Sequence, residues 1–370
     1  MSEIGRMPPP LNVPQHLNQN REQTGANAQG RQSDSLAVPD SLVNTPAASY
    51  TSGGPHPEVR NGCVIGIDAG GTKVNAAVAD MDGKVLGGGT AGPCNIAAMT
   101  AADAFKSARA ACLAALVSAG KLPEDVVAVC AGVAGVSFVD RRVEFTSMMQ
   151  DLFHDARVEV EPDYAIAFTG ATGGTPGVVV IAGTGSVAYG EDARGRAVKT
   201  GGYGYLIDDA GSGYGVGRDA IAAVLRAADK TGPSTVLVDR VLAALELDEV
   251  AAIVPGVYGG SISRVKVASL AAVVADVADT ETDEVAMSIL GTAGMSLATL
   301  VASIAGELFA GAVDPFPVAM VGSLWKGGNA ITVPFVRAIR AAAPTAVLAP
   351  PKESPLQGAL RRAQALVPFA

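Results

Sequence analysis

A short apolar strand, a glycine-rich turn and a second strand occur twice in this chain. The first copy, from Val64 to Gly87, reads VIGIDAGGTKVNAAVADMDGKVLG, and the second, from Val178 to Lys199, reads VVVIAGTGSVAYGEDARGRAVK. In each copy a turn of glycine with threonine or serine joins the strands, and a charged glycine turn follows. Glycine adopts positive φ and lets backbone N–H groups approach an anion, so such turns can cradle phosphates. Two such hairpins predict two lobes that hold a nucleotide between them.

Composition narrows the classes of protein that fit. The chain has 370 residues, of which 49% are hydrophobic and 17% are charged, enough for two domains with a large core. Its net charge of −9 argues against a general nucleic-acid or membrane-surface binder. The four cysteines show no C-x-x-C spacing and no pairing with the three histidines, which indicates reduced thiols in a cytosolic protein.

No segment has the pattern of a signal peptide or of a membrane span. The Ala/Val/Gly-rich run from Met287 to Gly311 comes nearest, but Glu307 and its small residues favour a buried helix. We therefore expect no membrane partner and no nucleic-acid partner.

The chain divides into a polar N-terminal segment and an α/β region. Residues 1–61 are rich in Pro, Gln, Asn, Ser and Gly and show no helical or strand period, so they are predicted to be a disordered tail. Strands and helices then alternate, which is typical of an α/β protein. We expect a first lobe over 62–174 and a second over 175–370, with the last helix able to pack back on the first lobe.

Apolar periodicity and capping residues predict the remaining elements. In the first lobe we expect a helix between Thr100 and Gly120 and strands at Val126–Ala131 and Val158–Val160. In the second lobe we expect helices near 212–230, 234–245, 265–278, 283–309, 329–342 and 355–366, with strands at 317–321 and 346–348.

Six segments in chain order carry a resemblance to a known superfamily. They are GIDAGGTK, GVAG, EPD before a helix, IAGTGS, GGYGYLIDDAGSGYGVG and MVGSLWKGG. Together they resemble the actin/sugar-kinase/Hsp70 superfamily, and within it the N-acetylglucosamine kinase branch and the activator ATPases of acyl-CoA reductases and dehydratases. The resemblance runs from about Val64 to the C-terminus. It implies a two-lobed actin-like ATPase fold of duplicated ribonuclease H-like domains, with ATP and Mg²⁺ as cofactors, and a cytoplasmic homodimer.

The two glycine turns are the candidate phosphate sites. The first turn, Gly70-Gly71-Thr72, offers backbone N–H groups and a hydroxyl to the β- and γ-phosphates, and Lys73 can offset their charge. Asp68 lies at the strand end, where a carboxylate can hold Mg²⁺ through water. Alone, these residues would equally suit an ordinary hairpin turn. The second turn, Gly183-Thr184-Gly185, favours the phosphate interpretation, and the resemblance implies that Thr184 contacts ATP.

Asp163 is the candidate general base. It follows a short strand and precedes a helix, which is where ligands of α/β sheets bind. A sugar hydroxyl needs a carboxylate to accept its proton during phosphoryl transfer. In the family, the aspartate at the matching strand end has this role, although an aspartate here also suits a helix N-cap.

The segment from Gly201 to Gly217 is the candidate sugar-recognition loop, because carboxylates accept hydrogen bonds from vicinal hydroxyls. Aligned with the kinase pattern Gly-Asp-Glu-Gly-Ser, Asp209 takes the place of the sugar-binding Asp, and Ala210 replaces the Glu. This replacement, and Tyr203 in place of the family's Trp, leave the sugar specificity open. An acidic helix cap is the alternative role for Asp209. The predicted substrate-binding set is Asn95, Gly202, Tyr203, Gly204 and Asp209, with Tyr203 where the family often has Trp.

Two further predictions each have an ordinary structural alternative. Asn95 matches an asparagine that faces the sugar in the family, although a turn after Pro93 explains it nearly as well. Gly322 and Ser323 are expected to meet adenine or ribose, and Ala268 is expected to line the adenosine pocket, although an alanine also suits a helix core.

Three functions compete at this point. The first is an ATP-dependent hexosamine kinase, a phosphotransferase with an alcohol acceptor, that acts on O6 of N-acetylglucosamine or glucosamine in amino sugar metabolism. The second is an activator ATPase, but its iron–sulfur cluster needs cysteine spacings that Cys63, Cys94, Cys112 and Cys130 lack. The third is a non-catalytic sugar sensor, against which the retained Asp68 and Asp163 argue.

Overall fold

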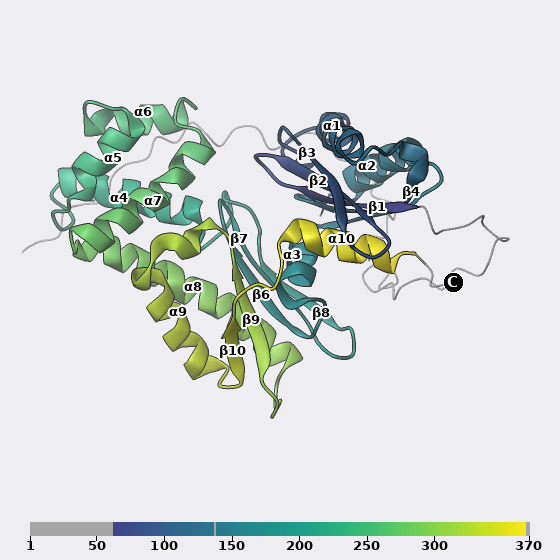
Figure 1. Ribbon diagram of the computed structural model, residues 1–370. Coiled ribbons are helices and arrows are strands. Elements are labelled where there is room, and N and C mark those ends of the chain that lie inside the picture. The colour runs from purple at the N-terminus through teal and green to yellow at the C-terminus, as the bar shows by residue number, and fades with distance from the viewer. Residues whose placement is uncertain (1–61, 137, 368–370) are drawn as a thin grey trace, which may run out of the picture. The chain divides into compact units, whose positions relative to one another are not determined.

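Two five-stranded sheets of the same topology form the framework of the protein (Figure 1). The computed structural model describes residues 62–136 and 138–367, all within one compact unit, and the predicted tail, residues 1–61, lies outside them. The strand orders are β3-β2-β1-β4-β5 and β10-β9-β6-β7-β8. In each sheet three consecutive strands form an antiparallel meander, and two later strands add in parallel beside its first strand. The predicted α/β class is confirmed, and the hairpin repeat marks the start of each copy.

The first sheet and its helices come from the N-terminal part of the described chain. The strands are β1 (Cys63–Ala69), β2 (Val74–Asp80), β3 (Val85–Ala91), β4 (Val126–Val133) and β5 (Arg157–Pro162), and the helices are α1 (Ala101–Ala119), η3 (Pro123–Asp125), α2 (Val139–Leu152) and α3 (Asp163–Thr172).

The second sheet is followed by a larger set of helices. The strands are β6 (Gly177–Ala182), β7 (Ser186–Glu191), β8 (Ala197–Gly201), β9 (Phe316–Val321) and β10 (Ala346–Ala349), and the helices are α4 (Gly213–Ala228), α5 (Leu237–Leu245), η4 (Val250–Ala252), α6 (Ile253–Tyr258), α7 (Arg264–Thr280), α8 (Glu284–Leu308), η5 (Ser323–Gly327), α9 (Asn329–Ala342) and α10 (Pro355–Ala365).

Most of these elements match the sequence-based expectations, and the helix caps show why. Thr100 accepts a hydrogen bond from the backbone N–H of Asp103, and Gly120 ends α1 in the left-handed region. Helices α2 and α6 were not predicted from the sequence. In α2 only Phe145 and Met149 are buried, which leaves an apolar repeat too sparse to mark a helix.

Both faces of the first sheet are covered by helices, and successive residues of β1 serve opposite faces. Ile65 and Ile67 pack with α1 and α2, whereas Val64 packs with Ile166 of α3 and Leu360 of α10. Figure 1 shows α1 and α2 on one side of this sheet and α10 on the other. A strand buried on both faces must be apolar throughout, as the sequence of β1 is up to Asp68.

Helix α3 packs against both sheets. Its Ile166 belongs to the cluster beneath the first sheet, whereas Phe168 and Ala171 pack on Val179 and Ala319 of the second sheet. Helix α3, whose first residue is Asp163, therefore lies between the two sheets.

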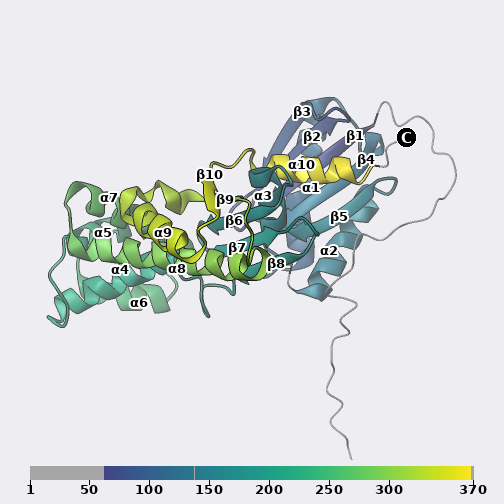
Figure 2. The ribbon, with the colours of Figure 1, turned by 90° about the horizontal axis from the view of Figure 1, so that it is seen from below.

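Helix α10 packs against β1, β4 and α3, and both ribbon views place it beside α3 (Figures 1 and 2). A Cβ on Gly358 would lie 2.1 Å from the carbonyl oxygen of Ile166, so only glycine allows this crossing. Arg362 of α10 donates to Thr169 over 2.7 Å, pairs with Glu161 of β5 and lies 3.5 Å from Glu191 of β7. One arginine therefore links acidic groups of both sheets.

Helix α8 is the one helix in the described part of the chain that is long and apolar enough to cross a membrane by length and composition. Ten of its residues are buried, and it packs against α9, β7 and β8. It therefore serves as a core helix of the second sheet.

Candidate active site

Asp68 and Asp163 lie at the same edge of the first sheet. β1, β4 and β5 are parallel neighbours, and Asp68 is in register with Gly132, which is in register with Glu161. Asp163 lies two residues after Glu161, directly after the end of β5. β4 lies between β1 and β5, so the two strand ends that precede the carboxylates are two strand spacings apart, or about 10 Å. This gap at the carboxyl edge is where α/β sheets bind ligands.

The Asp163 carboxyl has the properties of a base that works near neutral pH. Burial raises its pKa from 3.8 to about 6, and the neighbouring Asp68 adds to the rise. A hydrogen bond of 2.9 Å from the backbone N–H of Tyr164 to Oδ1 opposes it. Pro162 occupies the N-cap position of α3, and Asp163 is the first helical residue. The N-cap alternative raised by the sequence is therefore wrong.

Asp68 lies beside the first glycine turn. Burial raises its pKa above the usual 3.8, while Lys73 and a hydrogen bond from Asn75 act in the opposite direction. The turn residues Gly71, Thr72 and Lys73 are exposed. Within residues 62–136 and 138–367 there is no group of three metal-ligating side chains. A magnesium ion that is bound by one carboxylate and completed by substrate phosphates and water fits this arrangement.

Asn95 reaches the same edge through a bridge to the residue after β4. It pairs with Ala134, and its Oδ1 accepts a hydrogen bond of 2.9 Å from the backbone N–H of Ala97. Its Nδ2 lies 3.8 Å from the point where a Cβ on Gly71 would stand. The amide N–H₂ group of Asn95 is therefore close to the first glycine turn.

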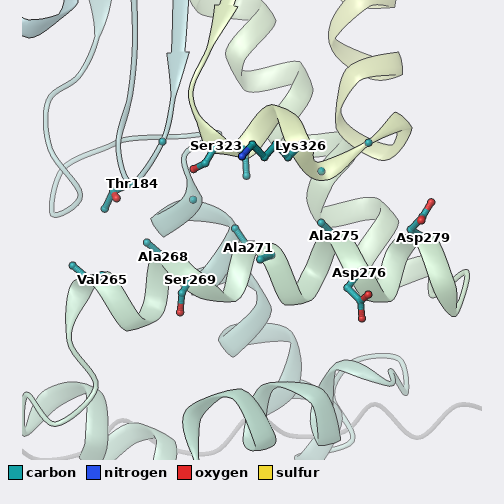
Figure 3. Close-up of a pocket in the computed structure, with 16 residues that line it drawn as sticks. Thr184, Val265, Ala268, Ser269, Ala271, Ala275, Asp276, Asp279, Ser323 and Lys326 are labelled. Atoms are coloured by element: carbon teal, nitrogen blue, oxygen red, sulfur yellow. The ribbon is translucent and has the colours of Figure 1, made fainter. Parts of the chain in front are cut away.

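A pocket of about 610 Å³ opens beside the second sheet (Figure 3). Four predicted nucleotide-site residues line it together, namely Gly183, Thr184, Ala268 and Ser323. Its volume falls within the usual range for sites that bind small ligands. The predicted residues Gly185 and Gly322 and the first turn, Gly70, Gly71, Thr72 and Lys73, do not line it.

The pocket is built from the end of β6, the start of α4, helix α7 and the turn after β9. The carbonyl of Gly183 accepts a 2.7 Å hydrogen bond from Gly213 N–H, which ties the second glycine turn to α4. Gly322 has a φ of 114°, and a Cβ there would lie 2.2 Å from the Ala182 carbonyl oxygen. Glycine at 322 therefore lets Ser323 reach the end of β6.

The floor of the pocket is a row of small residues on α7. Ala268, Ala271 and Ala275 face the Ser323–Gly327 turn in Figure 3, and alanine leaves space for a planar base. Lys326 and Asp279 also line this pocket. Lys326 belongs to the MVGSLWKGG segment that carries the resemblance, whereas Asp279 lies in no motif, because a lone aspartate forms no pattern until α7 and the turn come together.

The sugar-loop candidates lie next to a lysine that the sequence did not single out. Gly202 and Gly204 have φ values of 69° and 91°, and Tyr203 is 61% exposed. The Nζ of Lys199, on β8, lies 5.1 Å above the Tyr203 ring and 3.4 Å from the Gly202 carbonyl oxygen. Its charge also interacts with Asp163 and Asp209. Lys199 therefore carries a positive charge to the region between the candidate base and the loop.

Asp209 is buried, with 5% of its surface exposed, and burial raises the pKa of its carboxyl above 3.8. The strongest opposing influence is the charge of Arg264. The cap of α4 is Ser212, whose hydroxyl accepts a 3.0 Å hydrogen bond from Gly215 N–H. The alternative of Asp209 as an acidic cap is therefore wrong.

Two sheets of one topology, each opening with a glycine hairpin, are the architecture of the two-lobed actin-like ATPases. A solved structure from Chromobacterium violaceum, assigned as an N-acetylglucosamine kinase, shares this fold with a TM-score of 0.68 and 26% identity, over 81% of this chain and 98% of that chain. The family model described as the BadF/BadG/BcrA/BcrD ATPase family matches residues 65–359. This chain belongs to that family, and it uses ATP.

Two curated relatives are also similar. One is the N-acetylmuramic acid/N-acetylglucosamine kinase of Clostridium acetobutylicum, with 34% identity over 57% of this chain and 69% of the relative. The other is the N-acetyl-D-glucosamine kinase of Dictyostelium discoideum, with 29% identity over 72% of this chain and 84% of the relative. The recognition of the superfamily from its motifs is confirmed.

Proposed function

We propose that this protein is an ATP-dependent hexosamine kinase that phosphorylates the 6-hydroxyl of an amino sugar. We expect the sugar to be N-acetylglucosamine, with glucosamine as the alternative. The observation that carries the proposal is Asp163, a carboxylate with a pKa of about 6 at the sheet edge that also presents Asp68. The names of both curated relatives point to the same acceptor class.

In this proposal each catalytic task falls to a named group. Asp163 accepts the proton of the sugar hydroxyl as the phosphoryl group is transferred. The backbone N–H groups of Gly71 and Thr72, the charge of Lys73 and the second turn, Gly183 to Gly185, hold the phosphates. The N–H of Gly70 closes the first turn by donating to the Lys73 carbonyl over 3.0 Å. When bound, Mg²⁺ at Asp68 neutralises charge on the transferred phosphoryl group.

The nucleotide and the sugar then occupy neighbouring regions. Ala268 and Ser323, which line the pocket, contact the adenosine, and Gly322 directly precedes Ser323 and supports the turn that carries it. Asn95, Gly202, Tyr203, Gly204 and Asp209 surround the sugar. Tyr203 is exposed enough to stack on a sugar ring.

The activator-ATPase alternative loses support from the positions of the cysteines. An iron–sulfur cluster shared between subunits needs thiolates at a surface, whereas all four cysteines are free and buried. Burial raises the pKa of Cys63 to about 11 and that of Cys94 to about 12. The sensor alternative does not account for the raised pKa of Asp163.

We further propose that residues 62–174 form the sugar- and phosphate-binding lobe and residues 175–370 the nucleotide-binding lobe. The first sheet ends before residue 174 and β6 begins at Gly177, which supports this boundary. The buried, unpaired cysteines support a reducing, cytoplasmic location. We expect a homodimer whose substrates are small molecules.

An ADP-release screen tests this function. Purified protein with ATP and Mg²⁺ should release ADP when N-acetylglucosamine or glucosamine is added, and the product should carry phosphate on O6. N-acetylmannosamine, N-acetylmuramic acid and glucose complete the panel, and Asp163→Asn is the matched inactive control. If none of these sugars stimulates ADP release, the kinase proposal is wrong.

A further inference from the structure

Arg264, in the first turn of α7, has an unfinished set of hydrogen bonds. Its Nε atom is buried and has no hydrogen-bond acceptor among the described residues. Its Nη2 atom lies 3.8 Å from Oδ2 of Asp209, too far for a hydrogen bond. Nε and Nη2 form the edge with which arginine grips a carboxylate in a fork. Arg361 uses this same edge to bind Glu353 with two contacts of 2.5 Å.

Asp209, the partner across that gap, has a strained and buried position. Its φ is 83°, in the left-handed region that residues other than glycine avoid. Its carboxylate accepts backbone hydrogen bonds from Gly204, in the sugar loop, and from Ser186, after the second glycine turn. A Cβ on Gly185 would lie 2.9 Å from Oδ2. The carboxylate of Asp209 therefore contacts both the sugar loop and the phosphate loop.

Arg264 also connects this carboxylate to the nucleotide pocket. Its guanidinium lies 4.6 Å above the ring of Tyr205, which in turn packs edge-on against Tyr214 of α4 at 5.0 Å. This contact attracts the guanidinium to the face of the Tyr205 ring. The residues that follow on α7, Val265 and Ala268, line the pocket. A displacement of α7 on nucleotide binding would therefore move Arg264 relative to Asp209.

The sugar loop itself has few other anchors. Leu206 and Ile207 are more than 80% exposed, and Tyr203 is 61% exposed, so the apolar side chains at its tip pack on little of the described structure. The attachment of the loop to the second lobe thus depends strongly on Asp209 and on the Tyr205–Arg264 stack.

We infer that Arg264 is a positioning residue that completes a two-bond fork with Asp209 when nucleotide and sugar bind, and so holds this carboxylate ionised and directed at the sugar. The inference rests on the proposed kinase function. The charged groups that face Asp209 are Arg264 from α7, Lys199 from β8 and Asp208 from its own loop. Burial raises the pKa of Asp209, and the charge of Arg264 is the largest influence that lowers it. Loss of Arg264 should therefore raise this pKa and favour the protonated carboxyl.

Arg264→Met and Arg264→Lys test this role in the full chain with the sugar that the wild type accepts. Arg264→Met should raise the sugar KM by about 10- to 100-fold, which is the loss of affinity expected when one hydrogen bond to a charged group is removed. The kcat should stay within about threefold of the wild-type value. The rise should be larger at pH 6 than at pH 8, because protonation of Asp209 then competes with sugar binding. Arg264→Lys retains the charge without the fork and should show a smaller rise with near-normal pH dependence.

Lys266→Met is the matched control, since Lys266 lies on the same helix and forms an ion pair of 3.1 Å with the exposed Glu246. It should leave the sugar KM unchanged at both pH values. In an Asp209→Asn background, Arg264→Met should add no pH dependence. A melting curve for each variant checks folding, and Arg264→Lys keeps the test open if Arg264→Met does not fold.

The outcomes separate this inference from the kinase proposal. If the wild type transfers phosphate to a sugar and Arg264→Met has a normal sugar KM with unchanged pH dependence, the inference is wrong and the function stands. A KM rise that is equal at both pH values would also overturn it, since it would indicate a purely structural role. If the wild type uses no sugar, the function and the inference both fail.

Discussion

The pH dependence of phosphoryl transfer should follow the ionisation of Asp163. Burial raises its pKa from 3.8 to about 6, and the base must be deprotonated to accept the sugar proton. Activity should therefore be full above this pKa and should be lost as the pH falls through it. With a pKa of about 6, roughly one carboxyl in ten is ionised at pH 5, so kcat/KM should be about tenfold below its plateau there. An ordinary aspartate would remain more than about 90% ionised at the same pH.

Direct chromatographic measurement of ADP between about pH 4.5 and 8 would provide this profile without coupling enzymes. Asp163→Asn should lower kcat by roughly 10²–10⁴ and remove the acidic limb from the residual rate. Sugar affinity should stay within a few-fold. The pKa of Asp68 is also raised, but protonation there competes with magnesium. A limb that moves to lower pH as the Mg²⁺ concentration rises would belong to Asp68, whereas a limb fixed near pH 6 belongs to Asp163.

Two results would refute this reasoning. A profile that stays flat down to about pH 4.5 would mean that the carboxyl is not perturbed or that its ionisation does not limit turnover. An Asp163→Asn variant with near wild-type kcat would remove this residue from the mechanism.

Three other predictions concern the metal, the nucleotide and the link between the sheets. Turnover should stop in EDTA, and Asp68→Ala should abolish it with little change in melting temperature; activity in EDTA equal to that with Mg²⁺ would contradict a metal role. Ala268→Leu should raise the KM for ATP by about tenfold or more by filling the adenosine pocket, with an unchanged sugar KM; the exposed Ala110→Leu is its control, and an unaffected ATP KM would place the nucleotide elsewhere. Arg362→Met should lower the free energy of unfolding, measured in urea, by about 3–5 kcal/mol, because it leaves the acidic groups that Arg362 pairs with partly buried and unpaired. Arg361→Met, on the same helix but exposed, should lower it by about 0–1 kcal/mol. Equal losses of stability would refute the linking role of Arg362.

Local signals in the sequence were enough to predict much of the site. The glycine turns around Gly71 and Thr184 stand out without tertiary information, because glycine beside threonine directly follows an apolar strand in both. None of Gly70, Gly71, Gly183 and Gly185 has a positive φ, so the left-handed conformation expected of these glycines is wrong. Asp163 was predictable because strand, aspartate and helix follow one another directly. Helix ends such as Thr100 and Gly120 were equally readable, since caps depend on neighbours within one turn.

The groups that tune the site could not be predicted in this way. Lys199 reaches Tyr203 and influences Asp163 only because β8 lies at an edge of the second sheet while α3 is held between both sheets. Arg264 meets Asp209 from a helix that begins more than fifty residues later in the chain. Such contacts depend on which separate elements pack together, and a single polar contact between two elements forms no periodic pattern in the sequence.

The sequence by itself therefore determined the duplicated α/β framework, since apolar spacing and short-range backbone geometry mark its strands and helices. The two glycine turns as phosphate sites and Asp163 as the general base stay predictions, which draw on local pattern together with the resemblance. The tertiary structure alone decided that Asp163 is buried enough for a pKa of about 6 and that Arg362 ties both sheets to the last helix. It also decided that Asp209 is enclosed beside Arg264. Desolvation and charge pairing depend on everything that surrounds a group, and only the folded chain brings those surroundings together.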